Sequence, residues 1–139
     1  MYIFLDIDGV LNTQVSFPRL DPWCVHNFNT LLSKLNTKIV ISSSWRYMIS
    51  RETMTLKGFE LMLKTHGLIL SDGTVIDTTV RDEIINDRSE QILDYVRKNN
   101  LSKWVAIDDM TLNLPSNHFL KTNPIIGFSA EDVRKITGS

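Results

Sequence analysis

Clusters of carboxylate and hydroxyl side chains stand directly after short apolar runs at three places in the sequence. The clusters are Asp6-Ile7-Asp8-Gly9, Ser42-Ser43-Ser44 and Asp108-Asp109. Four carboxylates brought to one place would repel one another strongly unless a cation lay between them. Oxygen ligands without a His or Cys cluster favour a hard ion, for which Mg²⁺ is the best match. We therefore expect a magnesium site, provided that folding brings these clusters together.

EF-hands and phosphorelay receiver domains also contain clustered carboxylates. In an EF-hand loop that begins at Asp6, Gly9 would fall at position four and Phe17 would stand where the closing Glu belongs. A receiver domain would need a lone Asp after its middle strand and a Lys near its end, and the chain lacks this order. Both kinds of domain therefore fit the sequence poorly.

The apolar runs are continuous rather than alternating, as expected for parallel strands that are buried on both faces. The predicted strands are Tyr2–Leu5, Lys38–Ile41 and Trp104–Ile107, with weaker candidates at Thr74–Asp77 and Phe119–Lys121. The predicted helices are Pro22–Leu35 with Asp21 as its cap, Glu52–His66, Ser89–Asn99 and a short helix opened by Ser129. This alternation predicts a doubly wound, Rossmann-like parallel α/β sheet flanked by helices. Such a sheet binds ligands beyond the carboxyl ends of its strands, where the polar clusters stand.

Composition narrows the class of protein further. The 139 residues are 42% hydrophobic and 22% charged, with a net charge of -1, which predicts one globular domain over residues 1–139. This balance argues against binding nucleic acid or a membrane through bulk charge. No apolar run is long enough to span a bilayer, and the start of the sequence does not resemble a signal peptide. Cys24 is the only cysteine, so we expect no internal disulfide and a cytoplasmic location.

In this arrangement the sequence resembles the haloacid dehalogenase (HAD) superfamily of phosphatases, with four motifs in family order. The segments that carry the resemblance are Phe4–Leu11, Ile39–Arg46, Arg88 with the helix after it, and Trp104–Asp109. Within the superfamily, Ser43–Arg46, the Arg88 segment and Thr122–Ser129 are similar to a small cap-less group. That group includes the phosphatase domains of multi-domain RNA-repair proteins.

The resemblance implies a role for each residue of the motifs. Asp6 would attack phosphorus and form an aspartyl-phosphate, and Asp8 would act as general acid and base. Ser43 would hold a phosphoryl oxygen, and Arg88 would neutralise charge on the transferring group. The implied metal ligands are Asp6, the backbone carbonyl of Asp8, and Asp108 or Asp109, of which one binds directly and one through water. The implied substrate-binding residues are Gly9, which also permits a tight turn, Ser44 and Arg46.

Two of these assignments have competitors in the sequence. Ser42 or Ser44 could replace Ser43, which we favour because one residue then separates it from Trp45. Arg81 competes with Arg88 but lacks a following helix of the same pattern. The three tryptophans, Trp23, Trp45 and Trp104, are interpreted first as core residues.

The expected enzyme is a Mg²⁺-dependent phosphomonoesterase without a cap domain, since neither 9–42 nor 80–87 has room for one. An open site suits a phosphate on a large molecule, and Arg19, Arg46 and Arg51 could contact a nucleic-acid backbone. We therefore predict a phosphate at a nucleic-acid end, most simply a 3′-phosphate. The alternatives are a nucleotidase with Phe17 or Trp45 stacked on the base, a phosphotransferase, and a non-catalytic phosphate- or nucleotide-binding protein.

Overall fold

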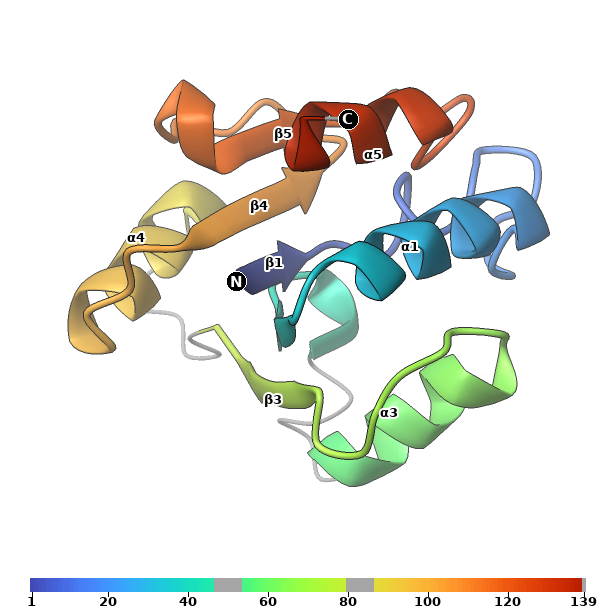
Figure 1. Ribbon diagram of the computed structural model, residues 1–139, viewed down its shortest axis with the longest axis horizontal. Coiled ribbons are helices and arrows are strands. Elements are labelled where there is room, and N and C mark those ends of the chain that lie inside the picture. Colours follow the sequence, from blue (N-terminus) through green and yellow to red (C-terminus); the bar gives the residue numbers. More distant parts are fainter. Residues whose placement is uncertain (47–53, 80–86, 139) are drawn as a thin grey trace.

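Five parallel strands form the centre of the computed structural model, which describes residues 1–46, 54–79 and 87–138 (Figure 1). The strand order across the sheet is β3-β2-β1-β4-β5. The strands are β1 (Tyr2–Leu5), β2 (Lys38–Ile41), β3 (Val75–Thr78), β4 (Trp104–Asp108) and β5 (Phe119–Lys121). All five predicted strands are confirmed, with shifts of one residue at some ends. The order reverses between β1 and β4, and it is at such a switch point that open α/β sheets bind ligands.

Four α-helices flank the sheet within the described residues, and the residue before each of them caps its N-terminus with a side-chain hydrogen bond. They are α1 (Pro22–Lys34), α3 (Leu56–Thr65), α4 (Arg88–Lys98) and α5 (Ala130–Thr137). The Asp21 side chain accepts hydrogen bonds from the backbone N–H groups of Trp23 and Cys24, which confirms the predicted cap of α1. The predicted start of the second helix at Glu52 lies outside the described residues, and the described part begins at Leu56 after the cap Thr55.

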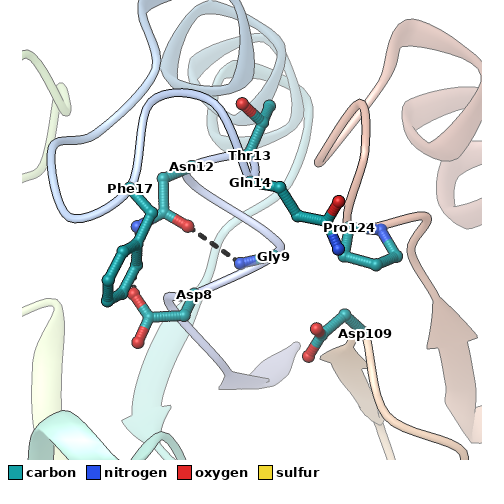
Figure 2. Close-up of a pocket in the computed structure, with 8 residues that line it drawn as sticks. All are labelled: Asp8, Gly9, Asn12, Thr13, Gln14, Phe17, Asp109 and Pro124. Atoms are coloured by element: carbon teal, nitrogen blue, oxygen red, sulfur yellow. Dashed lines mark hydrogen bonds between the residues drawn. The ribbon is translucent and has the colours of Figure 1, made fainter.

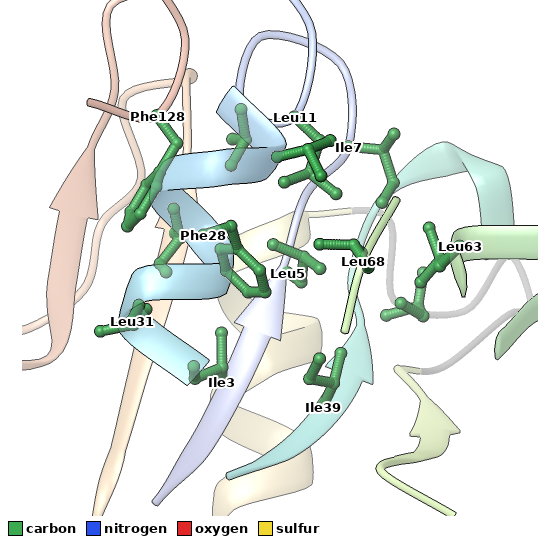
Figure 3. Close-up of a cluster of buried hydrophobic side chains, with 14 of the residues drawn as sticks. Ile3, Leu5, Ile7, Leu11, Phe28, Leu31, Ile39, Leu63, Leu68 and Phe128 are labelled. Atoms are coloured by element: carbon green, nitrogen blue, oxygen red, sulfur yellow. The ribbon is translucent and has the colours of Figure 1, made fainter. Parts of the chain in front are cut away.

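The sheet packs a separate apolar cluster on each face. Ile3 and Leu5 of β1 meet Phe28 and Leu31 of α1 on one face, together with residues of α3 and α5 (Figure 3). Phe4, between them in the sequence, points to the other face, where α4 covers it. Both faces of the central strand are therefore shielded from solvent, and this explains why its sequence is continuously apolar rather than alternating.

Two tryptophans test the sequence-based view of the core. Trp104 is buried and stacks on His118 with 4.3 Å between ring centroids, as expected of a core residue. Trp23 contradicts the prediction, because 75% of its surface is exposed. It follows Pro22 in the first turn of α1, and helix periodicity gives the inward positions there to Cys24, Val25 and Phe28.

The described ranges contain no separate cap domain over the carboxyl edge of the sheet. The loop from β1 to α1 and the loop from β5 to α5 meet at this edge, where the backbone N–H of Gln14 donates to the carbonyl of Pro124 (3.1 Å). No helix in the described part of the chain has the length and apolar character needed to cross a bilayer.

Candidate active site

The parallel register brings three predicted polar clusters to neighbouring strand ends. Leu5 pairs with Ile41 on one side and Ile107 on the other, so Asp6 lies between Ser42 and Asp108. These three residues have the same phase in the pleat, and their side chains therefore project from the same face of the sheet. All three are almost fully buried. A ligand that reaches Asp6 thus meets groups from three adjacent strands.

Three carboxylates form a compact acidic cluster at this point. One oxygen each from Asp6, Asp108 and Asp109 lies within 4.8 Å of the others, and such a group could hold a metal ion. Burial and the nearby Asp108 carboxylate raise the pKa of Asp6 to about 8, although the Arg88 guanidinium opposes this shift. Burial also raises the pKa of Asp109. The donor set is oxygen only, and a divalent hard cation would offset both the burial of these carboxylates and their mutual repulsion.

Arg88 is the cation that faces the cluster from α4. Its Nη1 lies 2.8 Å from Asp108 Oδ2 and 3.6 Å from Asp6 Oδ1. Asp87 caps α4 immediately before it, by accepting a hydrogen bond from the backbone N–H of Glu90. The predicted contact of Arg88 with the site therefore has a structural basis, whereas its competitor Arg81 lies outside the described residues.

Asp8 lies apart from the acidic cluster, on the other side of Gly9 in the close-up of Figure 2. Its two carboxylate oxygens accept hydrogen bonds from different neutral donors. Asn12 Nδ2 donates to Oδ1 at 2.9 Å, and Trp45 Nε1 donates to Oδ2 at 3.0 Å. Asp8 thus has no charged partner among the described residues, and it stands at the open side of the site rather than inside the cluster.

Gly9 permits the close approach of the two acidic loops. Its φ is +82°, and a Cβ atom there would lie 2.5 Å from Asp109 Oδ2. The turn is fixed from both ends, because the Gly9 N–H donates to Asn12 Oδ1 (2.9 Å) and Thr122 Oγ1 donates to the Gly9 carbonyl (2.8 Å). Only glycine fits this position without moving Asp109.

The three serines have different surroundings. The Ser42 hydroxyl is buried without a hydrogen-bond partner among the described residues, and Ser42 follows β2 in the same phase as Asp6 follows β1. The Ser43 hydroxyl, our predicted phosphoryl contact, accepts a hydrogen bond from the backbone N–H of Trp45 at 3.2 Å. Ser44 is exposed. The register therefore favours Ser42 over Ser43 as the hydroxyl beside Asp6.

Arg46 has a different environment from the one expected of a substrate contact. Only 4% of its surface is exposed, and Nη1 donates to the carbonyls of Ser42 (3.1 Å) and Ser43 (2.9 Å). Nη2 donates to Gln91 Oε1 of α4 at 3.0 Å. These contacts favour a role in holding the serine turn against α4. Arg51 lies outside the described residues, and Arg19 is exposed in the loop after β1.

A pocket of about 330 Å³ opens beside Asp8 and Asp109 (Figure 2). Its lining residues are Asp8, Gly9, Asn12, Thr13, Gln14, Phe17, Asp109 and Pro124. The Phe17 ring lies near Asp8 and is 58% exposed, while Gln14 and Pro124 close the opposite wall. Among the described residues of its lining, Phe17 is the aromatic one and none is Lys or Arg.

Sequence reasoning missed three residues that support these groups. Asn12 follows Asp8 by four residues, a spacing at which a turn returns the side chain, and it could have been found on that basis. Trp45 follows the serines on the neighbouring strand and was assigned to the core, so its indole donor was overlooked. Thr122 stands next to β5, far from the motifs in the chain, and no local pattern indicates its contact with Gly9.

A Rossmann-like parallel sheet, with an Asp-x-Asp turn after its central strand and an Asp pair after the adjacent one, defines a HAD-type hydrolase domain. A family model described as the HAD domain in Swiss Army Knife RNA repair proteins matches residues 2–133, and the chain belongs to this family. Membership supports a HAD-type phosphatase in general. Comparisons with curated proteins and with solved structures gave no match.

Proposed function

We propose that this protein is a Mg²⁺-dependent phosphomonoesterase that acts through an aspartyl-phosphate on Asp6. The observation that carries the proposal is the placement of Asp6. It is buried at the switch point of the sheet, between a hydroxyl and a second carboxylate, with Arg88 facing it from α4. Asp8 is nearby yet outside this cluster, as a separate acid and base requires.

The acidic cluster fits a magnesium ion by its donor chemistry. Asp6, Asp108, Asp109 and the backbone carbonyl of Asp8 are the proposed ligands. When bound, Mg²⁺ supplies positive charge that offsets repulsion between the phosphate dianion and the attacking carboxylate.

In the first proposed step, a carboxylate oxygen of Asp6 bonds to phosphorus while the bond from phosphorus to the leaving oxygen breaks. The leaving oxygen keeps the electron pair and takes a proton from Asp8, so the first product departs as an alcohol. In the second step Asp8 takes a proton from water, whose oxygen bonds to phosphorus as the phosphorus–Asp6 bond breaks. Inorganic phosphate leaves, and both side chains return to their starting forms.

Charge on the transferring phosphoryl group needs donors that are already in place. Arg88 is proposed to supply one, since its guanidinium lies beside Asp6 and is held by Asp108. A serine hydroxyl after β2 is proposed as another. The unpartnered hydroxyl of Ser42 supports Ser42 in this role ahead of Ser43.

For the substrate, we propose a phosphate at a nucleic-acid end, in particular a 3′-phosphate. The family description names RNA repair proteins, and no separate cap domain covers the site in the described ranges. Of the three arginines first considered as backbone contacts, Arg19 is the exposed one among the described residues. Its position in the loop after β1 supports a contact with phosphate groups outside the pocket.

A second candidate is a nucleotidase or another phosphatase of small ring-bearing substrates, and the pocket favours it. The exposed Phe17 ring beside Asp8 offers a stacking surface to the leaving group, while the acidic lining would repel further phosphates inside the pocket. The two candidate substrates therefore differ in the part of the molecule beyond the ring that carries the phosphate, which is a nucleic-acid chain in the first and absent or small in the second.

The test is kcat/KM with Mg²⁺ for a 3′-phosphorylated oligonucleotide, a nucleoside monophosphate and a sugar phosphate. Asp6→Asn should abolish turnover of all three, whereas Asp72→Asn, a change at an exposed acidic residue, should not. A preference for the nucleoside monophosphate would favour the second candidate, and turnover by Asp6→Asn would overturn the covalent mechanism. Phosphate transfer to added alcohols would indicate a phosphotransferase, and binding without turnover would indicate a non-catalytic protein.

A further inference from the structure

Trp45 supplies one of the two hydrogen bonds that fix the carboxylate of Asp8. The indole N–H donates to Oδ2 at 3.0 Å, while Asn12 donates to Oδ1 from the opposite side. The two donors come from different parts of the chain, one from the loop after β1 and the other from the η1 turn (Ser44–Arg46) after β2. Asp8 is thereby tied to the neighbouring strand as well as to its own loop.

The indole itself is held rigidly. Its ring packs edge-to-face on Phe59 of α3, with 6.4 Å between centroids and an interplanar angle of 83°. Its backbone N–H is bound to Ser43 Oγ. The next residue, Arg46, is buried and ties the same turn to α4 through Gln91. A donor supported on both faces of the sheet can hold its acceptor in one position with little loss of side-chain entropy.

An indole N–H also suits a partner that must gain and lose a proton. It donates only, does not ionise, and brings no charge that would bias the carboxylate toward either form by Coulomb attraction. Each oxygen of Asp8 has two lone pairs, so one stays free on each oxygen when Trp45 and Asn12 are bound. The contacts can therefore orient Asp8 without occupying the site of proton transfer.

We propose that Trp45 is a positioning residue that aims Asp8 at the leaving-group oxygen. This inference rests on the proposed function, in which the proton of Asp8 passes to that oxygen as its bond to phosphorus breaks. In this role Trp45 acts through Asp8 alone, and it is not among the residues that line the pocket. The pocket that would receive the leaving group is lined by Asp8 and by Asp109 of the acidic cluster.

The test compares two leaving groups in the Trp45→Phe variant, which keeps an aromatic ring for Phe59 but removes the N–H. The alkoxide leaving group of an alkyl phosphate needs a proton on its oxygen. The p-nitrophenolate of p-nitrophenyl phosphate is a weak base and leaves readily without one. The ratio kcat/KM covers the steps up to formation of the phospho-enzyme. It therefore includes this proton transfer and excludes the later hydrolysis of the phospho-enzyme. We expect a loss of about tenfold or more for the alkyl phosphate and less than about threefold for the aryl phosphate.

Two controls separate positioning from a general structural effect. Trp23→Phe makes the same substitution at an exposed tryptophan and should leave both substrates unaffected. In the Asp8→Asn background, Trp45→Phe should cause no further loss, because a residue that acts only through Asp8 has nothing left to orient. Equal losses on both substrates, or losses that simply add in the double variant, would refute the inference.

A measurement without turnover covers the case in which Trp45→Phe folds poorly. The chain has three indole N–H groups, and the NMR signal of Trp45 should move upfield in Asp8→Ala, which removes the acceptor, while the other two stay in place. If that signal does not move, the hydrogen bond is absent and the inference fails. If Asp8→Asn is as active as wild type, the proposed function fails with it, whereas an impaired Asp8→Asn beside a normal Trp45→Phe overturns this inference alone.

Discussion

Two aspartates separated by a single residue lie in opposite electrostatic surroundings at this site. Asp6 is buried beside the Asp108 carboxylate, and burial together with this like charge raises the pKa of its carboxyl to about 8. Asp8 instead accepts hydrogen bonds from an amide and an indole at the edge of a pocket. β1 ends at Leu5, and the turn that begins at Asp8 directs its carboxylate away from that of Asp6, with the buried Ile7 between them. This separation matches the distinct roles proposed for them.

The raised pKa of Asp6 predicts that Asp6→Asn stabilises the metal-free protein. The unfolded chain ionises this carboxyl near its usual value of 3.8, but the folded protein holds the proton up to about 8. Between these values the folded state binds more protons, so the free energy of unfolding of wild type falls as pH rises. Asn does not ionise, so the variant does not lose stability in this way as pH rises. The Tm advantage of Asp6→Asn in EDTA should therefore grow from pH 5 to pH 8, and an advantage that shrinks over this range would contradict the prediction.

At the residue scale, the sequence was sufficient for the polar clusters but not for their neighbours. Asp6, Asp108 and Asp109 could be placed together because they follow apolar runs, and strand ends meet at one edge. The indole of Trp45 could not be assigned, since its direction depends on the η1 turn and on Phe59 of a distant helix. Arg46 was predicted to bind substrate, and its burial against Gln91 depends on tertiary packing that the sequence pattern does not reveal.

At the element scale, the turns beyond the strands complete the site that the parallel register assembles. The β1–α1 loop and the loop after β4 approach so closely at Gly9 that a single Cβ would collide with Asp109. The elements themselves were predictable from periodicity and caps, such as Asp21 before α1 and Ser129 before α5. The contacts between these elements at the carboxyl edge of the sheet were not predictable. Thr122, for example, lies just after β5 and contacts Gly9, which is more than a hundred residues earlier in the chain.

Gly9→Ala should therefore lose metal binding, and Gly73→Ala is its matched control. Both glycines have a φ near +80°, but a Cβ at Gly73 meets nothing within 4 Å. Each alanine should cost about 1–2 kcal/mol of stability for the left-handed backbone. Only Gly9→Ala should also abolish the rise in Tm that Mg²⁺ causes, because Asp109 is displaced. Thermal melts with and without Mg²⁺ measure both effects, and an equal Mg²⁺ response in the two variants would argue against Asp109 as a ligand.

At the scale of the whole molecule, sheet order determines where charge collects. Because β1 lies between β2 and β4, the switch point of the sheet has an acidic residue on each side of it. The net charge of -1 is small, yet two of the four buried acidic residues in the described ranges, Asp6 and Asp108, lie side by side at this edge, with Asp109 next to them. The fold thus holds carboxylates close enough to repel one another, and a bound cation would reduce this repulsion.

Mg²⁺ should accordingly stabilise the whole protein. An ion that binds only the folded state at a hundred times its Kd raises the free energy of unfolding by about 2.7 kcal/mol. Asp108→Asn should reduce this gain, whereas Asp94→Asn, which removes a carboxylate of α4 that is paired with Lys98, should preserve it. Tm titrations with Mg²⁺ give the comparison. An unchanged response in Asp108→Asn would place the metal elsewhere.

The pairing of β1 with β4 also has a consequence for how the chain is made. Tyr2 lies opposite Trp104, so the first strand waits for its partner until about a hundred further residues have been synthesised. During that time β1 can pair only with β2, and its other apolar edge stays open to other chains. A message truncated between these two strands would yield the Asp-x-Asp turn without Asp108 or Asp109. Such a fragment would be both inactive and prone to aggregate.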